Sequence, residues 1–392
     1  MRGSAEERLL LRTAAVTGSD DEIRAAVAEV VDWNRFHGLA QVERAIAVIH
    51  PRLRSIAADL IPSQVLDQMR RVALVSDFAM LHLESRLRES LNGLERANVR
   101  VMLLKGAGLA YSVYGDVRKR PMSDIDILVD PSAAQTTRRV LLDVGWCELS
   151  GGVSNLVYDQ HQHSSPLRDT RSPDLVLEIH TALFPKRQPF DFGADELWSR
   201  GRPLTEGAGR GAFAPHPVHS LLHACLHFVW SHEGRFGVWR TIRDVDAISR
   251  DADMDWEAFV MAAQKARGGT SCYWALRIAR EAGGVDVPRD VMDTLRPDRS
   301  PHLLRAIERH FLANIFPAAG GRCPSQTLAQ VLWELGVMPR RSGHGDIRPW
   351  DSDEEFILPG ETRDTPRRSF RAERLMRVLA SPAYVRSLLR VR

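Results

Sequence analysis

Two aspartates two positions apart are the residues in this sequence best suited to chemistry. Asp124 and Asp126 lie in the segment SDIDILVD (123–130), where acidic and apolar residues alternate. That alternation is typical of a half-buried strand, on which residues two apart point to the same face. Two carboxylates roughly 7 Å apart on one face repel each other. A divalent cation between them relieves that repulsion, and carboxylate oxygens suit Mg²⁺.

A second alternating segment, DLVLEIHTALF (174–184), places Glu178 and His180 on a shared strand face. If this strand lies beside the first, Glu178 completes a cluster of three carboxylates. Such a cluster can hold two metal ions roughly 3.5–4 Å apart and stabilise an in-line displacement at phosphorus. The sequence therefore predicts a site with two Mg²⁺ ions, whose ligands and catalytic residues are Asp124, Asp126 and Glu178.

A glycine-rich turn precedes the acidic strand. In LLKGAGLAYSVYG (103–115) a short apolar strand runs directly into a helix. Glycine permits close approach of the backbone to a ligand, and a helix N-terminus attracts phosphate through its free N–H groups. The basic run at 118–120 follows and can contact a triphosphate. The predicted nucleotide-binding residues are Lys105, Gly106, Ala107, Arg118, Arg120 and Ser123.

The elements around these motifs predict an α+β protein. Residues 99–205 read as a small mixed sheet with helices on it, because strand and helix patterns alternate there. Residues 1–98 form an N-terminal helical region that ends in one long amphipathic pattern at 62–98. Residues 206–335 form a C-terminal helical domain. Residues 336–392 are an extended linker, with a polar loop at 340–366, followed by a basic terminal helix at 368–392.

Composition limits the class of protein. The 392 residues include 53 basic and 50 acidic side chains, a formal charge of +3. Binding to nucleic acid is possible, but so small a net charge does not support it. No apolar run reaches the length of a membrane span and the N-terminus has no secretory pattern, so we expect a soluble cytoplasmic protein. The four cysteines form no CxxC pair, which argues against a zinc cluster.

Taken together, the motifs resemble the nucleotidyltransferase superfamily, which includes polymerase β. The closest resemblance is to the bacterial nucleotidyltransferase family of the NTP_transf_5 type, and it covers roughly residues 35–295. Its strand, turn and acidic motifs match LLKGAGLA (103–110), RPMSDIDILV (120–129) and LEIH (177–180). Two helical segments, LLHACLHF (221–228) and WRTIRDVDAIS (239–249), resemble the family's helical tail and make His227 and Asp244 matching positions.

The resemblance implies a nucleotidyltransferase-type sheet core and a Mg²⁺-dependent reaction. A nucleoside monophosphate passes from an NTP, with ATP as the expected donor, to an acceptor hydroxyl, and pyrophosphate leaves. Asp124 and Asp126 bind metal, while Glu178 binds the second metal or acts as the base. His180, His227 and Asp244 are expected near the acceptor or behind the ligands. The acceptor stays open between a small molecule, a peptide or protein, and a tRNA end.

Two other functions compete with this interpretation. Many superfamily members have serine in the glycine turn, whereas this chain has Ala107, so a catalytically inactive nucleotide-binding or interaction protein with the same fold is one alternative. The other is a metal-dependent phosphohydrolase built on a histidine-rich helical segment, although the spacing lacks the HExxH form and favours a buried helix face. These histidines are His216, His219, His223, His227 and His232.

Overall fold

The computed structural model describes residues 3–148, 164–184, 188–316, 323, 326–337 and 382–389. It confirms the predicted α+β class, with one seven-stranded mixed sheet among many helices. The strands are β1 (Met102–Leu103), β2 (Asp124–Leu128), β3 (Trp146–Glu148), β4 (Leu167–Asp169), β5 (Val176–His180), β6 (Arg202–Pro203) and β7 (Phe213–Ala214). The helices are α1 (Ala5–Arg12), α2 (Asp20–Ala28), α3 (Trp33–Val42), α4 (Ile46–Ala57), α5 (Ser63–Arg96), α6 (Lys105–Ser112), α7 (Ala134–Asp143), α9 (Ala194–Ser199), α10 (Pro217–Trp230), α11 (Val238–Ser249), α12 (Trp256–Lys265), α13 (Gly269–Gly283), α14 (Arg289–Leu295), α15 (Pro301–Ala313), α16 (Gln326–Val337) and α18 (Pro382–Leu389).

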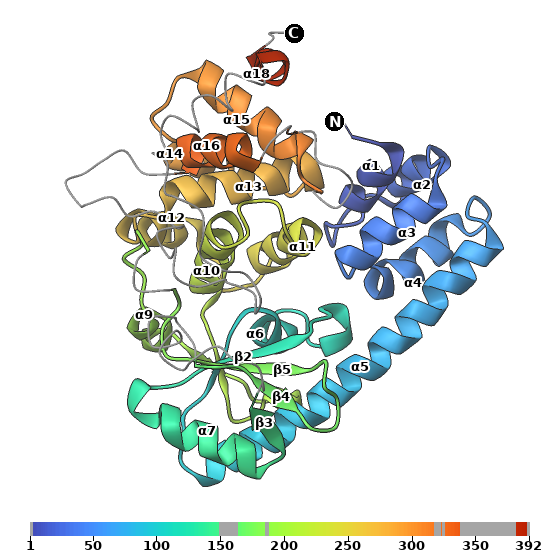
Figure 1. The fold of residues 1–392 in the computed structure, drawn as a ribbon. Coiled ribbons are helices and arrows are strands. Elements are labelled where there is room, and N and C mark those ends of the chain that lie inside the picture. The colour runs from blue at the N-terminus through green and yellow to red at the C-terminus, as the bar shows by residue number, and fades with distance from the viewer. Residues whose placement is uncertain are drawn as a thin grey trace, which may run out of the picture.

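The sheet has the strand order β3-β4-β5-β2-β1-β7-β6. Its centre consists of the three strands that the sequence predicts, with β2 parallel to β5 and antiparallel to β1. The other four strands are two or three residues long, too short for alternation to show in the sequence. Helices α5 and α7 lie against one face of the sheet, while α6 and the C-terminal helices lie on the other side (Figure 1).

Helix α5 connects the N-terminal helices to the sheet (Figure 1). The predicted range of 62–98 differs from the observed 34-residue helix, Ser63–Arg96, by one and two residues at its ends. Near its start Met69 packs into the apolar cluster of the N-terminal helices. Farther along, Leu83 and Leu87 pack into a second cluster with the apolar face of the sheet. One continuous amphipathic helix therefore joins two hydrophobic cores.

The N-terminal and C-terminal helices share one apolar cluster. Leu9 and Phe36 belong to the same cluster as Trp239 and Phe311. The Trp239 indole N–H donates a hydrogen bond of 3.2 Å to the Thr13 hydroxyl in the interior. The first 60 residues and the C-terminal helical segment therefore stabilise each other through common buried surface. The predicted boundaries at 98, 205 and 335 stay predictions.

A buried ion pair fastens α5 to the sheet. The side chains of Arg86 and Asp169 are both fully buried, and Arg86 Nε lies 2.8 Å from Asp169 Oδ1. His82 Nε2 lies 2.8 Å from the other carboxylate oxygen. Arg86 Nη2 also donates to the carbonyl oxygen of Val144 at 2.9 Å. In the interior, these hydrogen-bond partners take the place of the water that would otherwise solvate the charges of Arg86 and Asp169.

Asp169→Asn should lower the free energy of unfolding by about 3–5 kcal/mol, because it removes the buried counter-charge of the Arg86 guanidinium and leaves only the more exposed carboxylate of Glu89 beside it. Urea denaturation at neutral pH measures this loss. The same substitution at the exposed Asp174, Asp174→Asn, serves as the control and should change stability by no more than about 0.5 kcal/mol. A loss below 1 kcal/mol at position 169 would contradict the assigned role of the pair.

Two predictions from the sequence concern the C-terminal part and the membrane. The predicted loop at 340–366 lies outside the described residues, and of the predicted helix at 368–392 only α18 is described. Within the described ranges, none of the helices combines the length and apolar character needed to cross a bilayer.

Candidate active site

The acidic residues of β2 and β5 lie side by side because the two strands are parallel and in register. Asp126 pairs with Glu178 across the strands, and Leu128 pairs with His180. The alternate residues Ile125 and Leu177 point into the apolar cluster under the sheet. Strand alternation therefore turns the acidic side chains to the opposite face.

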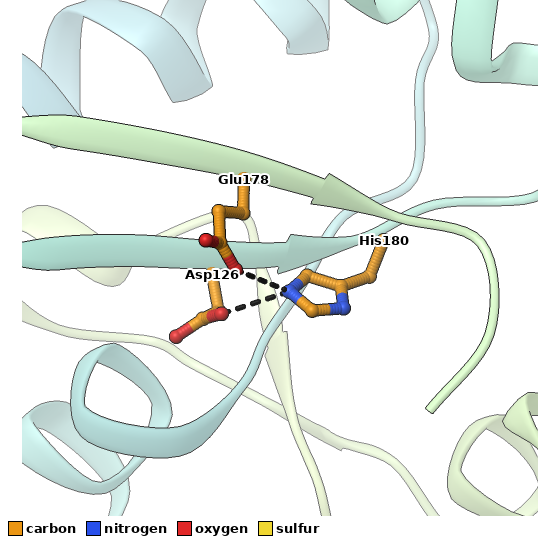
Figure 2. Close-up of side chains that lie close together, drawn as sticks. All are labelled: Asp126, Glu178 and His180. Atoms are coloured by element: carbon orange, nitrogen blue, oxygen red, sulfur yellow. Dashed lines mark hydrogen bonds and ion pairs between the residues drawn. The ribbon is translucent and has the colours of Figure 1, made fainter. Parts of the chain in front are cut away.

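Three side chains converge on this face: Asp126, Glu178 and His180 (Figure 2). Their ligand atoms all lie within 4.8 Å of one another. His180 Nε2 is 2.8 Å from Asp126 Oδ1 and 3.3 Å from Glu178 Oε2. Because carboxylates only accept hydrogen bonds, we assign the proton to Nε2, so the imidazole orients both carboxylates. The carboxylate oxygens are hard donors of the kind that Mg²⁺ prefers.

Asp124 lies on the same strand face but outside this group of three. The Ser123 hydroxyl donates to Asp124 Oδ1 at 3.2 Å. Burial raises the pKa of Asp124, and repulsion from Asp126 raises it further. The sequence predicts a metal site of Asp124, Asp126 and Glu178, whereas the structure places His180 beside the last two. A cation between the two aspartates would relieve the repulsion that raises the pKa of Asp124.

Lys105 faces the carboxylates from the turn between β1 and α6. Its Nζ lies 2.7 Å from Asp126 Oδ1 and 4.0 Å from Glu178 Oε2. Its backbone adopts a left-handed φ of 46°, which is uncommon for a residue with a Cβ and costs on the order of 1–3 kcal/mol. The sequence predicts that Lys105 contacts phosphate, but in the structure its ammonium contacts Asp126.

The glycines of the turn allow α6 to begin directly at the strand end. A Cβ at Gly108 would collide with the carbonyl oxygen of Leu103. Gly106 lines the pocket described below, next to Met122 and Arg120. The methyl of Ala107 is buried in the apolar cluster of the sheet. A serine hydroxyl at position 107 would lie in that cluster, so the departure from the superfamily turn removes no group from the pocket.

The charges at the centre of the site depend on one another. Burial by itself would raise the pKa of Asp126, but Lys105 and the hydrogen bond from His180 outweigh it and hold the pKa well below its usual range. Burial opposes protonation of His180 and Lys105, yet the carboxylates raise the pKa of both. The site therefore keeps Asp126 ionised at neutral pH.

A pocket of about 280 Å³ lies between the sheet and helices α10 and α11. Asp124 and Asp126 line it on the sheet side, together with Lys105, Gly106 and Ser123. The helical side carries polar and charged side chains next to the apolar Ala224, Phe228 and Phe236. Its lining residues include Arg44, His223, His227, His232, Arg240, Thr241 and Asp244. The pocket therefore has a carboxylate wall and a basic wall.

Arg120 connects these two walls. Its Nε lies 2.7 Å from Asp244 Oδ1 and its Nη2 lies 2.8 Å from Asp244 Oδ2, a two-pronged contact. The Tyr114 hydroxyl also donates to Asp244 Oδ1 at 2.8 Å. The predicted triphosphate contact Arg120 lines the pocket but is neutralised by Asp244. Arg118 is not brought into the pocket, because its exposed guanidinium pairs with Asp116.

The histidines of the C-terminal segment are kept neutral by burial. Burial lowers the pKa of His223 to about 3 and that of His232 to about 4, and it holds the pKa of His227 well below its usual range. All three line the pocket. Among the described residues, the group able to hold a metal is Asp126, Glu178 and His180, not these histidines. The phosphohydrolase alternative therefore has no metal cluster in the described part of the chain.

Glu43 lies behind the basic wall, where its Oε2 accepts a hydrogen bond of 3.0 Å from the Trp239 backbone N–H. Burial raises its pKa to about 7, against the opposing effects of that hydrogen bond and of Arg240. The folded state then holds a proton that the unfolded state releases near pH 4.5. Stability should fall as the pH rises from about 4.5 to about 7, by about 1.4 kcal/mol per unit of pKa difference.

Glu43→Gln should remove this slope, because the amide keeps an acceptor for Trp239 but does not titrate. The midpoint of urea unfolding, measured at pH 5 and pH 8 for both proteins, checks the prediction. Relative to the wild type, the variant should gain stability at pH 8. An equal change of the unfolding midpoint between pH 5 and pH 8 in the two proteins would contradict the prediction.

Sequence reasoning missed several residues that the pocket contains. Arg240 is four residues before Asp244, so both lie on one helix face, and this spacing could have indicated it. Arg44 carries no comparable signal, because only the fold brings it to the pocket. The Tyr114 hydroxyl reaches the site through its contact with Asp244.

Comparison with known proteins agrees with the geometry. No curated protein and no solved structure gives a significant match. A family model described as uncharacterised nucleotidyltransferase matches residues 29–284. This range includes β2, β5, the glycine turn and both helices of the basic wall. The chain therefore belongs to this nucleotidyltransferase family.

Proposed function

We propose that this protein is a Mg²⁺-dependent nucleotidyltransferase that moves a nucleoside monophosphate from an NTP, with ATP as the expected donor, to an acceptor hydroxyl. The acceptor oxygen forms a bond to the α-phosphorus, the bond from that phosphorus to the β-phosphate oxygen breaks, and pyrophosphate leaves. The observation that supports this most is the in-register pairing of Asp126 with Glu178 across parallel strands, at the edge of a pocket that Asp126 lines.

The residues of the site have separate roles in this proposal. Asp124, Asp126 and Glu178 would hold two Mg²⁺ ions, which supply positive charge to the α-phosphate and the leaving group. His180 keeps Asp126 and Glu178 oriented through its Nε2. Glu178 is the less buried carboxylate of the pair, with 22% of its side chain exposed against 3% for Asp126. It is therefore the more accessible of the two, and in its alternative role, in place of holding the second metal, it takes the proton from the acceptor hydroxyl.

Incubation with each labelled NTP and a host lysate, with Mg²⁺ or with EDTA, tests the proposal. We expect the label to move to one acceptor class and pyrophosphate to be released, both only with Mg²⁺. Glu178→Gln should abolish both, while Glu148→Gln, on the separate strand β3, should not. Label transfer that persists in EDTA, or NTP binding without any transfer, would contradict the proposal; the second result favours an inactive nucleotide-binding protein.

A further inference from the structure

The basic wall of the pocket carries more positive charge than its own carboxylates neutralise. Arg44, Arg120 and Arg240 all line it. Asp244 is engaged by Arg120. Within the described part of the chain, no carboxylate forms an ion pair with Arg44 or Arg240. Two guanidinium groups therefore face the pocket without a carboxylate in ion-pair contact among the described residues.

Arg240 stands in the first turn of α11, at the pocket. The helix begins after Gly237, which has a φ of 67° and offers no side-chain cap. A Cβ at Gly237 would lie 3.0 Å from Arg240 Nη2, so glycine leaves room for the guanidinium over the helix end. Gly237, Arg240 and Thr241 all line the pocket. The positive end of the helix dipole adds to the charge of Arg240 there.

The cluster is electrostatically unfavourable as it stands. Burial lowers the pKa of Arg240, and repulsion from Arg120 and Arg44 lowers it further, while Glu43 opposes them. Partly desolvated like charges persist where an anion binds between them. In the same pocket His223, only 4% exposed, has a buried Nε2 without a hydrogen-bond partner. A phosphate oxygen would neutralise the guanidinium groups and give His223 Nε2 a hydrogen-bond partner.

We propose that Arg44 and Arg240 bind the β- and γ-phosphates of the NTP, the part that leaves as pyrophosphate. This inference rests on the proposed function, which places the α-phosphate beside Asp126. From an α-phosphate at the metal-binding carboxylates, the distal phosphates extend toward the opposite, basic wall, where Arg44 and Arg240 supply positive charge. Pyrophosphate takes the electron pair of the broken phosphorus–oxygen bond, and the two arginines stabilise the charge that develops on it.

Another arginine-rich cavity, of about 400 Å³ between α13, α14 and α15, offers the control. Its Arg277 is paired with Glu308 at 3.0 Å, so part of its charge is neutralised. Arg289 at its edge is 90% exposed. Arg289→Gln therefore removes one arginine from a basic cavity with little effect on packing.

Calorimetric titration with ATP, AMP and inorganic pyrophosphate, each with Mg²⁺, tests the inference. Arg240→Gln and Arg44→Gln should each weaken binding of ATP and pyrophosphate by about 10- to 100-fold and leave AMP binding unchanged. Arg240→Lys should fall between the wild type and Arg240→Gln, because it keeps the charge and loses the two-pronged geometry. Arg289→Gln should bind all three ligands as the wild type does.

The outcomes separate this inference from the proposed function. Wild-type protein that binds no NTP with Mg²⁺ overturns both. Wild-type protein that binds ATP while Arg44→Gln and Arg240→Gln bind it equally well overturns only the phosphate assignment, as does an equal loss of ATP and AMP binding. Arg44 is exposed, so its variant remains informative should Arg240→Gln fail to fold.

Discussion

Asp126→Asn should reduce nucleotidyl transfer by at least about 10²–10³-fold, the range for removing one preorganised electrostatic contact. Asp126 is the residue on which the site converges, because Lys105, His180 and its strand partner Glu178 all contact it or lie beside it. Asparagine keeps the shape of the side chain and removes the charge that would bind Mg²⁺. The loss should therefore appear in kcat and in the Mg²⁺ dependence, measured under conditions where urea denaturation shows the variant to be folded.

Pyrophosphate release at a series of Mg²⁺ concentrations measures this effect. Asp130→Asn is the matched control: Asp130 follows the same strand, is exposed, and its carboxylate bonds only to Ser132 among the described residues. It should keep transfer within about twofold of the wild type, as is usual for a surface substitution. Transfer by Asp126→Asn at more than a tenth of the wild-type rate would rule out the assigned role of this carboxylate.

Asp244→Asn should destabilise the protein by about 3–5 kcal/mol and also lower transfer, because Arg120 would become a buried cation without a counter-charge. The side chains of Arg120 and Asp244 are only 12% and 7% exposed. Their contact joins the segment before β2 to α11, so it holds the carboxylate wall against the basic wall. Loss of the contact should widen or misalign the pocket.

Urea denaturation and transfer assays on the same preparations separate the two effects. Tyr114→Phe removes one hydrogen bond to Asp244 and should cost about 1 kcal/mol. Asp286→Asn, at an exposed position of the C-terminal segment, should leave stability and transfer unchanged. A stability loss for Asp244→Asn no larger than that for Tyr114→Phe would show that the ion pair does not hold the two walls together.

Strong periodicity made the central elements predictable. The alternating segments at 123–130 and 174–184 appear as β2 and β5, and the long amphipathic pattern at 62–98 appears as α5. Strands β3, β4, β6 and β7 escaped prediction because two or three residues contain no usable period. Their place in the sheet comes from hydrogen bonds to neighbouring strands, which local sequence does not record.

The candidate site was predictable as a set of faces but not as a set of contacts. Alternation alone put Asp124, Asp126 and Glu178 on one side of their strands. It did not show that His180, rather than Asp124, would complete the group with Asp126 and Glu178. The distances in that group depend on the strand register and on how far each side chain reaches.

By itself, the sequence determined the α+β class, the family, and the acidic strand faces, because these follow from local periodicity and from motifs within short segments. Only the tertiary structure decided that Arg120 forms an ion pair with Asp244 instead of staying available to a ligand. It also decided that Arg44 and Arg240 lie together on the basic wall of the pocket. It also decided that the N-terminal helices share a core with the C-terminal helices. These contacts join residues more than 100 positions apart, and their partners are selected by packing of the whole chain, which no local pattern encodes.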